Sequence, residues 1–366
     1  MNNTLDLYTD YVLTAVKRAT ATGLSELVDG SVSHDSITRF LSNRDYGSKD
    51  LWKNVKPLVR QHENEEACLI FDDFIIDKPY TDENEIVNWH FDHKVSRAVK
   101  GIGVLTAFYH TQTNSGSEQS EPLRIPVGYE VLKKEIHYCD VNTRKEKRAS
   151  ILSKNELMRQ MIDQSIVNQL IFKYILADSW FSSSENMLFI HAKEKLFIFD
   201  LKSNRNAALT DEDRNKGQWK RIDELDTPDN TPVKVWLKDL EIPVLLIKQV
   251  FKNKDNSTGV RYLVSNDLSL TADQFRDLYK KRWSVEEYHK STKQNAAIAK
   301  SPTRTIRTQS NHVFMSIFAY VKLERLKFAH KLNHFAIKAK LNMAAMKVIF
   351  KELNYYKQAL EELKSA

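Results

Sequence analysis

Acidic residues follow two separate apolar runs in the sequence. Asp73 closes a segment that begins with the run at 67–71, and Asp178 comes directly after the run at 174–177. Short apolar runs of this kind predict buried strands, and buried strands do not normally end in acids. Carboxylate oxygens are the ligands that Mg²⁺ prefers, and two ions about 4 Å apart can stabilise the attacking and leaving oxygens of a phosphodiester bond. The strand ends therefore predict a metal site.

A third acid lies far downstream, in a segment with helical spacing. Tyr279, Arg282, Glu286 and Lys293 follow one another at steps of three, four and seven, which predicts one shared helix face. A phenol, a guanidinium, a carboxylate and an ammonium on one face are costly in an apolar core, but they suit a metal ligand flanked by phosphate donors. The alternative is a solvated helix with salt bridges along its surface.

The segments that must position these acids alternate between strand and helix. The residues at 99–109 and 126–131 are predicted strands, and 153–169 has the apolar spacing of a helix. This alternation favours a mixed α/β core with its site at strand ends. A β-rich insertion is predicted from four runs with no long helix between them, at 196–201, 233–237, 244–251 and 260–264. Helical spacing returns at 271–294, 310–331 and 343–363.

The N-terminal segment has the outline of a helix-turn-helix. A first helix is predicted from Thr4 to about Ala21, interrupted by Gly23, and Ser33 is a good N-cap for the next helix. The outer face of that next helix carries Thr38 and Arg39, which could reach bases in a major groove. Short helix pairs with polar outer faces are also ordinary in proteins that bind no DNA.

Positive charge is concentrated at the C-terminal end. From Tyr279 to Ala366 there are 18 Lys/Arg against 6 Asp/Glu, or +12, so the other residues sum to −5 of the net +7. Such a region suits the binding of a polyanion, although a helical surface with charges of one sign also increases solubility. Phe314, Phe318 and Val321 form an apolar stripe there, which fits either a core or a subunit interface.

Cysteine content and hydropathy set the expected compartment. Cys68 and Cys139 are too few for a disulfide framework or a structural zinc site, which suits a reducing cytosol. The longest apolar runs, such as 243–250, are too short to cross a bilayer. We expect a cytoplasmic, nucleoid-associated protein with no membrane partner.

The helical spacing also carries a family resemblance. Tyr-x2-Arg-x3-Glu-x6-Lys at 279–293 resembles the YREK signature of the IS-four family of bacterial insertion-sequence transposases, and the segments ending in Asp73 and Asp178 are similar to the strands bearing that family's two aspartates. The resemblance implies an RNase H-like catalytic core interrupted by a β-rich insertion domain. It also implies two Mg²⁺ or Mn²⁺ ions held by Asp73, Asp178 and Glu286. Phosphates near the cut would be contacted by Tyr279, Arg282 and Lys293.

Two departures from the family pattern bear on the site. Phe74 stands where members commonly have a threonine after the first catalytic aspartate, so both Asp72 and Asp73 stay open, with Asp73 preferred. Ser179 and Trp180 stand where the second motif often has a charged pair.

These observations predict a DNA transposase that hydrolyses the ends of its element and joins them to target DNA, by cut-and-paste through a hairpin intermediate. Its partners would be the terminal inverted repeats, target DNA and a second subunit in a paired-end homodimer. Further DNA contacts are assigned to Lys290, Trp219 and Trp236.

The alternatives are a catalytically silent, domesticated DNA-binding protein and an RNase H-like nuclease without strand transfer. The predicted domains are a helical DNA-binding domain (1–62), the first part of the core (63–190), the insertion (191–270), the second part of the core (271–310) and a helical C-terminal region (311–366).

The helix-turn-helix assignment predicts an effect of Arg39→Ala. Binding to the element's own end should weaken more than binding to random DNA, because base contacts specify sequence whereas phosphate contacts bind every duplex. Titration of both duplexes at one fixed salt concentration measures the difference. An equal loss on the two duplexes would assign Arg39 to the DNA backbone instead.

Overall fold

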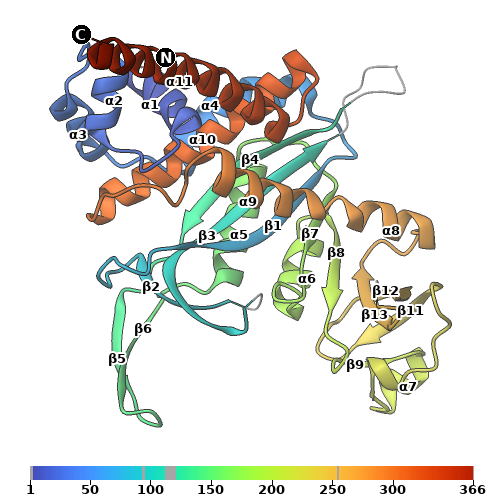
Figure 1. Cartoon of the computed structure of the whole chain (residues 1–366). Helices are drawn as coiled ribbons and strands as arrows, with labels where there is room; N and C mark the ends of the chain where they lie inside the picture. The colour runs from blue at the N-terminus through green and yellow to red at the C-terminus, as the bar shows by residue number, and fades with distance from the viewer. Residues whose placement is uncertain (1–2, 93–94, 112–120, 254, 366) are drawn as a thin grey trace. The chain divides into compact units, whose positions relative to one another are not determined.

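The computed structural model divides into two compact units (Figure 1). The sheet unit comprises Tyr46–His289, and the helical unit comprises Met1–Asp45 with Lys290–Ala366. The structure describes residues 3–92, 95–111, 121–253 and 255–365.

An eleven-stranded mixed sheet is the core of the sheet unit. Its strands are β1 (Cys68–Asp77), β2 (Val87–Asp92), β3 (Arg97–Thr111), β4 (Leu123–Val131), β7 (Tyr174–Ala177), β8 (Leu196–Leu201), β9 (Asn206–Ala208), β10 (Lys220–Arg221), β11 (Pro232–Leu237), β12 (Pro243–Lys252) and β13 (Thr258–Ser265). A separate hairpin of β5 (Ile136–Asp140) and β6 (Lys145–Ala149) extends away from this sheet (Figure 1).

Five strands in the order β4-β3-β1-β7-β8 form the part of the sheet that carries the acids. β3 is antiparallel to both β4 and β1, whereas β7 runs parallel to both β1 and β8. The first five residues of β1 and all of β7 are buried, as continuous apolar runs predict for strands covered on both faces. This mixed α/β arrangement is consistent with the RNase H-like superfamily.

The sheet unit also contains helices. They are α4 (Ser48–His62), α5 (Lys154–Val167), α6 (Ser184–Ala192), α7 (Asp211–Asn215), the 3-10 helix η1 (Ile222–Glu224), α8 (Ala272–Lys280) and the first half of α9 (Trp283–Asn295). α4 and α5 pack on β4, while α6 and α8 pack on β8. α5 begins with the capping box of Ser153 and Glu156, which satisfies two backbone N–H groups at its start.

The strands predicted for the insertion are present. β8 pairs with β13, and β13, β12, β11, β9 and β10 then follow in antiparallel order, so they continue the same sheet. That these strands form a separate insertion domain stays a prediction, as does the division of the chain into five domains. α4, which we placed in the N-terminal domain, belongs to the sheet unit.

The helical unit contains α1 (Asn3–Thr14), α2 (Ala21–Leu27), α3 (His34–Asn43), α10 (Ile306–His330) and α11 (His334–Ser365), together with the end of α9. α1 and α3 both pack on α10. Phe314, Phe318 and Val321 are fully buried, so this stripe is core and offers no exposed interface.

The N-terminal helices differ from the prediction in two respects. The first helix ends at Thr14, and Gly23 lies inside α2, where it does not interrupt a helix. The Thr20 side chain accepts a hydrogen bond from the Gly23 N–H, so Gly23 is the third residue of a capped helix start. The Ser33 cap is confirmed, because its hydroxyl accepts from the Ser36 N–H. Within the described residues, no helix is long and apolar enough to cross a membrane.

Candidate active site

Strand register brings three acids to one level of the sheet. Phe71 of β1 pairs with Ala177 of β7, which pairs with Phe199 of β8. The residue after each is an aspartate: Asp72, Asp178 and Asp200. Residues at matching positions of parallel strands point to the same face, so these side chains form a row across three strands.

Glu286 of α9 meets the first acid of that row. Ligand atoms of Asp72, Glu286 and His289 all lie within 4.8 Å of one another. Arg282 Nη1 lies 3.5 Å from Asp72 Oδ2 and 4.0 Å from Glu286 Oε1. A guanidinium between two carboxylates offsets their repulsion and has further N–H groups for a phosphate.

Asp73 is not part of this cluster, because successive residues of a strand point to opposite faces, although its charge helps to raise the pKa of Asp178. Its Oδ2 accepts from Lys154 Nζ at 2.7 Å, in a salt bridge with α5. Asp72 is only 8% exposed and is the aspartate beside Glu286. The geometry therefore favours Asp72 as the first acid, the alternative that the sequence left open, over the preferred Asp73.

Burial raises the pKa of the acids in the row. The pKa of Asp72 rises to about 8, chiefly through burial; the charge of Arg282 lowers it, and the charges of Asp178 and Glu286 raise it further. Burial also raises the pKa of Asp178, although its Oδ1 accepts from the Trp180 N–H at 2.9 Å. A cation beside these carboxyl groups would favour their charged form and so offset the effect of burial.

The continuous helix predicted at 271–294 is wrong. α8 ends at Lys280, and α9 begins at Trp283, with a turn at Lys281 and Arg282 between them. The N–H of Arg282 donates to the carbonyl of Tyr279, three residues back, instead of four. Such tighter turns rotate the chain further per residue than an α-helix does, so the predicted single face is broken here.

Each residue of the four-residue pattern consequently has a different setting. Tyr279 is buried at the end of α8, and guanidinium carbons of Arg282 and Arg261 lie 5.7 and 5.6 Å from its ring centre. Burial raises the pKa of its phenol. Lys290 and Lys293 are exposed on the part of α9 that belongs to the helical unit.

The two tryptophans chosen from the sequence are not the most exposed indoles. Trp219 is half-buried, and Trp236 is buried with the guanidinium carbon of Arg214 4.0 Å from its ring centre. Trp180 and Trp283 are 51% and 63% exposed and stand two residues after Asp178 and three before Glu286. Their proximity in sequence to the acids was the signal that would have selected them.

Two further polar residues were missed. Asp200 ends an apolar run just as Asp178 does, and its carboxylate lies 3.7 Å from Arg261. His289 follows Glu286 by three residues, the spacing of neighbours on a helix face. Thr38 and Arg39, the predicted base contacts, are both exposed on α3 of the helical unit.

The donor set suits a hard divalent cation. Asp72 and Glu286 offer carboxylate oxygens at chelating separation, and Asp178 follows the strand next to Asp72. Mg²⁺ and Mn²⁺ take such ligands in octahedral geometry, with water completing the shell. The residues present therefore fit a metal site.

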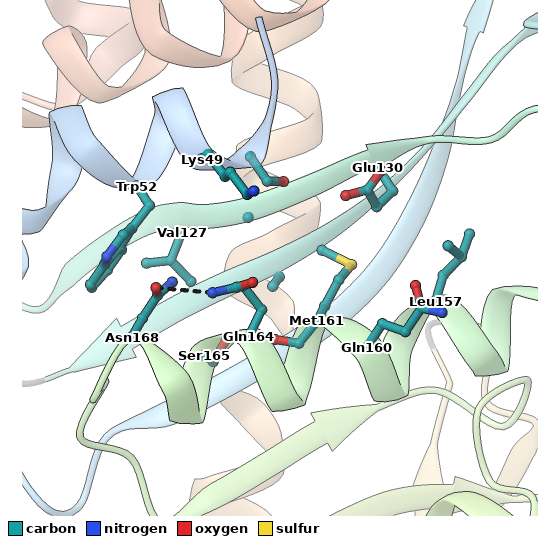
Figure 2. Close-up of a pocket in the computed structure, with 13 residues that line it drawn as sticks. Lys49, Trp52, Val127, Glu130, Leu157, Gln160, Met161, Gln164, Ser165 and Asn168 are labelled. Atoms are coloured by element: carbon teal, nitrogen blue, oxygen red, sulfur yellow. Dashed lines mark hydrogen bonds between the residues drawn. The ribbon is translucent and has the colours of Figure 1, made fainter.

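A pocket elsewhere in the sheet unit is separate from these acids. The pocket has a volume of about 270 Å³. It lies between α4, β4 and α5, and Trp52, Glu130, Met161 and Gln164 are among its lining residues (Figure 2). None of the acids of the row lines it. This volume lies at the small end of ligand pockets, and we assign it no role.

The crowded acids predict a stabilising effect of Asp72→Asn in the metal-free protein. The pKa of about 8 lies above the value near 4 of an unfolded aspartate, so the unfolding free energy should fall as pH rises from about 4 to about 8. At pH 8 Asp72→Asn should be more stable than wild type by roughly 1–2 kcal/mol. Urea denaturation with a chelator, at pH 5 and pH 8, measures this difference in unfolding free energy.

Asp77→Asn, at an exposed position of β1, is the control, and its unfolding free energy should change little. A less stable Asp72→Asn at pH 8 would contradict the repulsion argument.

Two family models match the chain. Residues 1–235 match the family described as DDE superfamily endonuclease, and residues 149–322 match the family described as Transposase DDE domain. No curated protein matches the chain. Enzymes with DDE domains use divalent metal ions, as the donor set here suggests. The first match covers more than half of the chain, which therefore belongs to the DDE superfamily of endonucleases and is a nuclease of the transposase type.

Proposed function

We propose that this protein is a DDE transposase of the IS-four kind that excises its element and joins the freed 3′ hydroxyl to target DNA. The observation that carries the proposal is the meeting of Asp72 and Glu286 around Arg282, with Asp178 on the neighbouring strand. Asp72 lies within β1, Asp178 directly follows β7 and Glu286 lies on α9, so the three ligands come from three separate elements.

The three carboxylates would hold two Mg²⁺ or Mn²⁺ ions. When bound, such ions activate the attacking hydroxyl and stabilise the leaving oxygen. Asp72 would hold an ion together with Glu286, and its strand pairs with β7, which Asp178 directly follows. The Lys154–Asp73 salt bridge would fix β1 from its other face.

Cationic side chains of the same segment would position the DNA. Arg282 would donate to a phosphate beside the cut, while the buried ring of Tyr279 supports its guanidinium. Lys290 and Lys293 are exposed for phosphate contact, and the exposed indole of Trp283 offers a face to an unpaired base. Thr38 and Arg39 of α3 would read the terminal repeat.

A cleavage assay on DNA carrying the element's end tests the assignment of the acids. Asp72→Asn and Glu286→Gln should fold and bind the end, yet lose roughly 10³-fold or more in cleavage, because several kcal/mol of transition-state stabilisation go with a metal ligand. Asp73→Asn is the matched control and should retain far more activity. Full activity of Glu286→Gln, or the opposite order of the two aspartate variants, would refute the assignment.

The products distinguish the proposed reaction from its alternatives. A hairpin on the excised end and joining to target DNA support cut-and-paste transposition. Cleavage without joining would indicate a nuclease, and end binding without cleavage by the wild-type protein would indicate a silent DNA-binding protein.

α11 supplies the proposed subunit contact. Met346, Ile349, Leu353, Tyr356 and Leu360 are between 47% and 64% exposed. Their steps of three and four residues form the apolar seam of a coiled coil. Because an element has two ends to be joined, we assign this seam to a second copy of the chain.

Leu353→Glu should weaken the dimer by about tenfold or more, since it places a charge in an apolar seam. Gln358→Glu introduces the same charge off the seam and should leave the dimer intact. Light scattering with and without end DNA gives the mass of each species. A single subunit that completes strand transfer on one end would rule out the dimer.

A further inference from the structure

His289 lies inside the proposed metal site without belonging to the acid triad. Its side chain is 5% exposed, and one of its ring nitrogens lies within 4.8 Å of carboxylate oxygens of both Asp72 and Glu286. Glu286 and His289 are three residues apart on α9, so both project from one face of the helix toward β1.

Aromatic packing holds the imidazole in this place. The rings of His289 and Phe74 have centroids 4.4 Å apart, and Tyr288 lies against the same imidazole at 5.4 Å. Phe74 and Asp72 are two residues apart on β1 and so share one face of that strand. The ring that supports His289 is therefore on the side of the strand from which Asp72 projects.

The ligand type that His289 adds changes which cation the site prefers. Mg²⁺ takes oxygen ligands almost exclusively, whereas Mn²⁺ and later transition metals accept imidazole nitrogen as well. A site of two carboxylates and one imidazole is therefore better suited to Mn²⁺ than a site of carboxylates alone.

We propose that His289 is a nitrogen ligand of the cation held by Asp72 and Glu286, and that it biases this site toward Mn²⁺ over Mg²⁺. The proposal rests on the proposed function, because it takes the same acids as metal ligands. The simpler role, a buried histidine that only packs on Phe74, makes the opposite prediction in the experiment below.

The test is pulsed electron paramagnetic resonance of the full-length protein with Mn²⁺ alone. Wild type should show a hyperfine coupling from a ¹⁴N nucleus bound to the ion, which changes to that of ¹⁵N when histidine is labelled with ¹⁵N. His289→Gln should lose the coupling and bind Mn²⁺ roughly tenfold more weakly. Its affinity for Mg²⁺ should change less, so the ratio of the two affinities falls.

Two controls make the result specific. His110→Gln removes another buried imidazole, on β3, and should keep the coupling. The labelled wild-type protein needs no substitution: absence of a histidine coupling there overturns the proposal even where His289→Gln does not fold, and a coupling points to His289 as the histidine grouped with Asp72 and Glu286 in the described residues.

The two proposals fail differently. A wild-type protein that binds Mn²⁺ and cleaves end DNA, but shows no histidine nitrogen coupling, overturns the role of His289 and leaves the proposed function intact. Retention of the coupling in folded His289→Gln likewise overturns the role of His289 and leaves the proposed function intact. A wild-type protein that neither binds Mn²⁺ nor cleaves end DNA overturns the proposed function itself.

Discussion

Mutual repulsion of buried carboxylates is the constraint that the site must satisfy. Two unit charges 4 Å apart cost about 4 kcal/mol at an effective dielectric constant of 20. The structure places Asp72 beside Glu286 and next to the strand that ends in Asp178, with Arg282 as the nearby countercharge. Such an arrangement persists only where the surrounding framework is held by other interactions. Here the apolar residues of β1 and β7 that precede the acids are fully or almost fully buried.

The two faces of β1 divide the chemistry between neighbouring residues. Asp72 projects toward α9, and Asp73 projects toward Lys154 of α5. A shift of one residue in strand register would exchange these roles, since side chains alternate with a period of two. The parallel pairing of Phe71 with Ala177 fixes the register, and so it selects which aspartate lies beside Glu286 in the proposed metal site.

The turn between α8 and α9 has a comparable effect on the cationic side of the site. A continuous helix would have kept Tyr279 and Glu286 on one face, whereas the break leaves Tyr279 as a buried support for the guanidinium of Arg282. Arg282 and Asp72 are 210 residues apart in the chain, and their contact ties the helix that carries Glu286 to the central strand. The proposed catalytic site and the packing of α9 against β1 thus share this contact.

The sequence by itself determined the mixed α/β class, most strands and helices, and the candidate acids Asp178 and Glu286, because these follow from local apolar periodicity and from spacing within short segments. It could not choose between Asp72 and Asp73, because both follow the same apolar run. Only the pairing with the neighbouring strand decides which of the two side chains faces Glu286. Nor could it locate His289 beside Asp72, a contact across more than half of the chain. The tertiary structure decided these points, because long-range register and packing set the direction of a side chain.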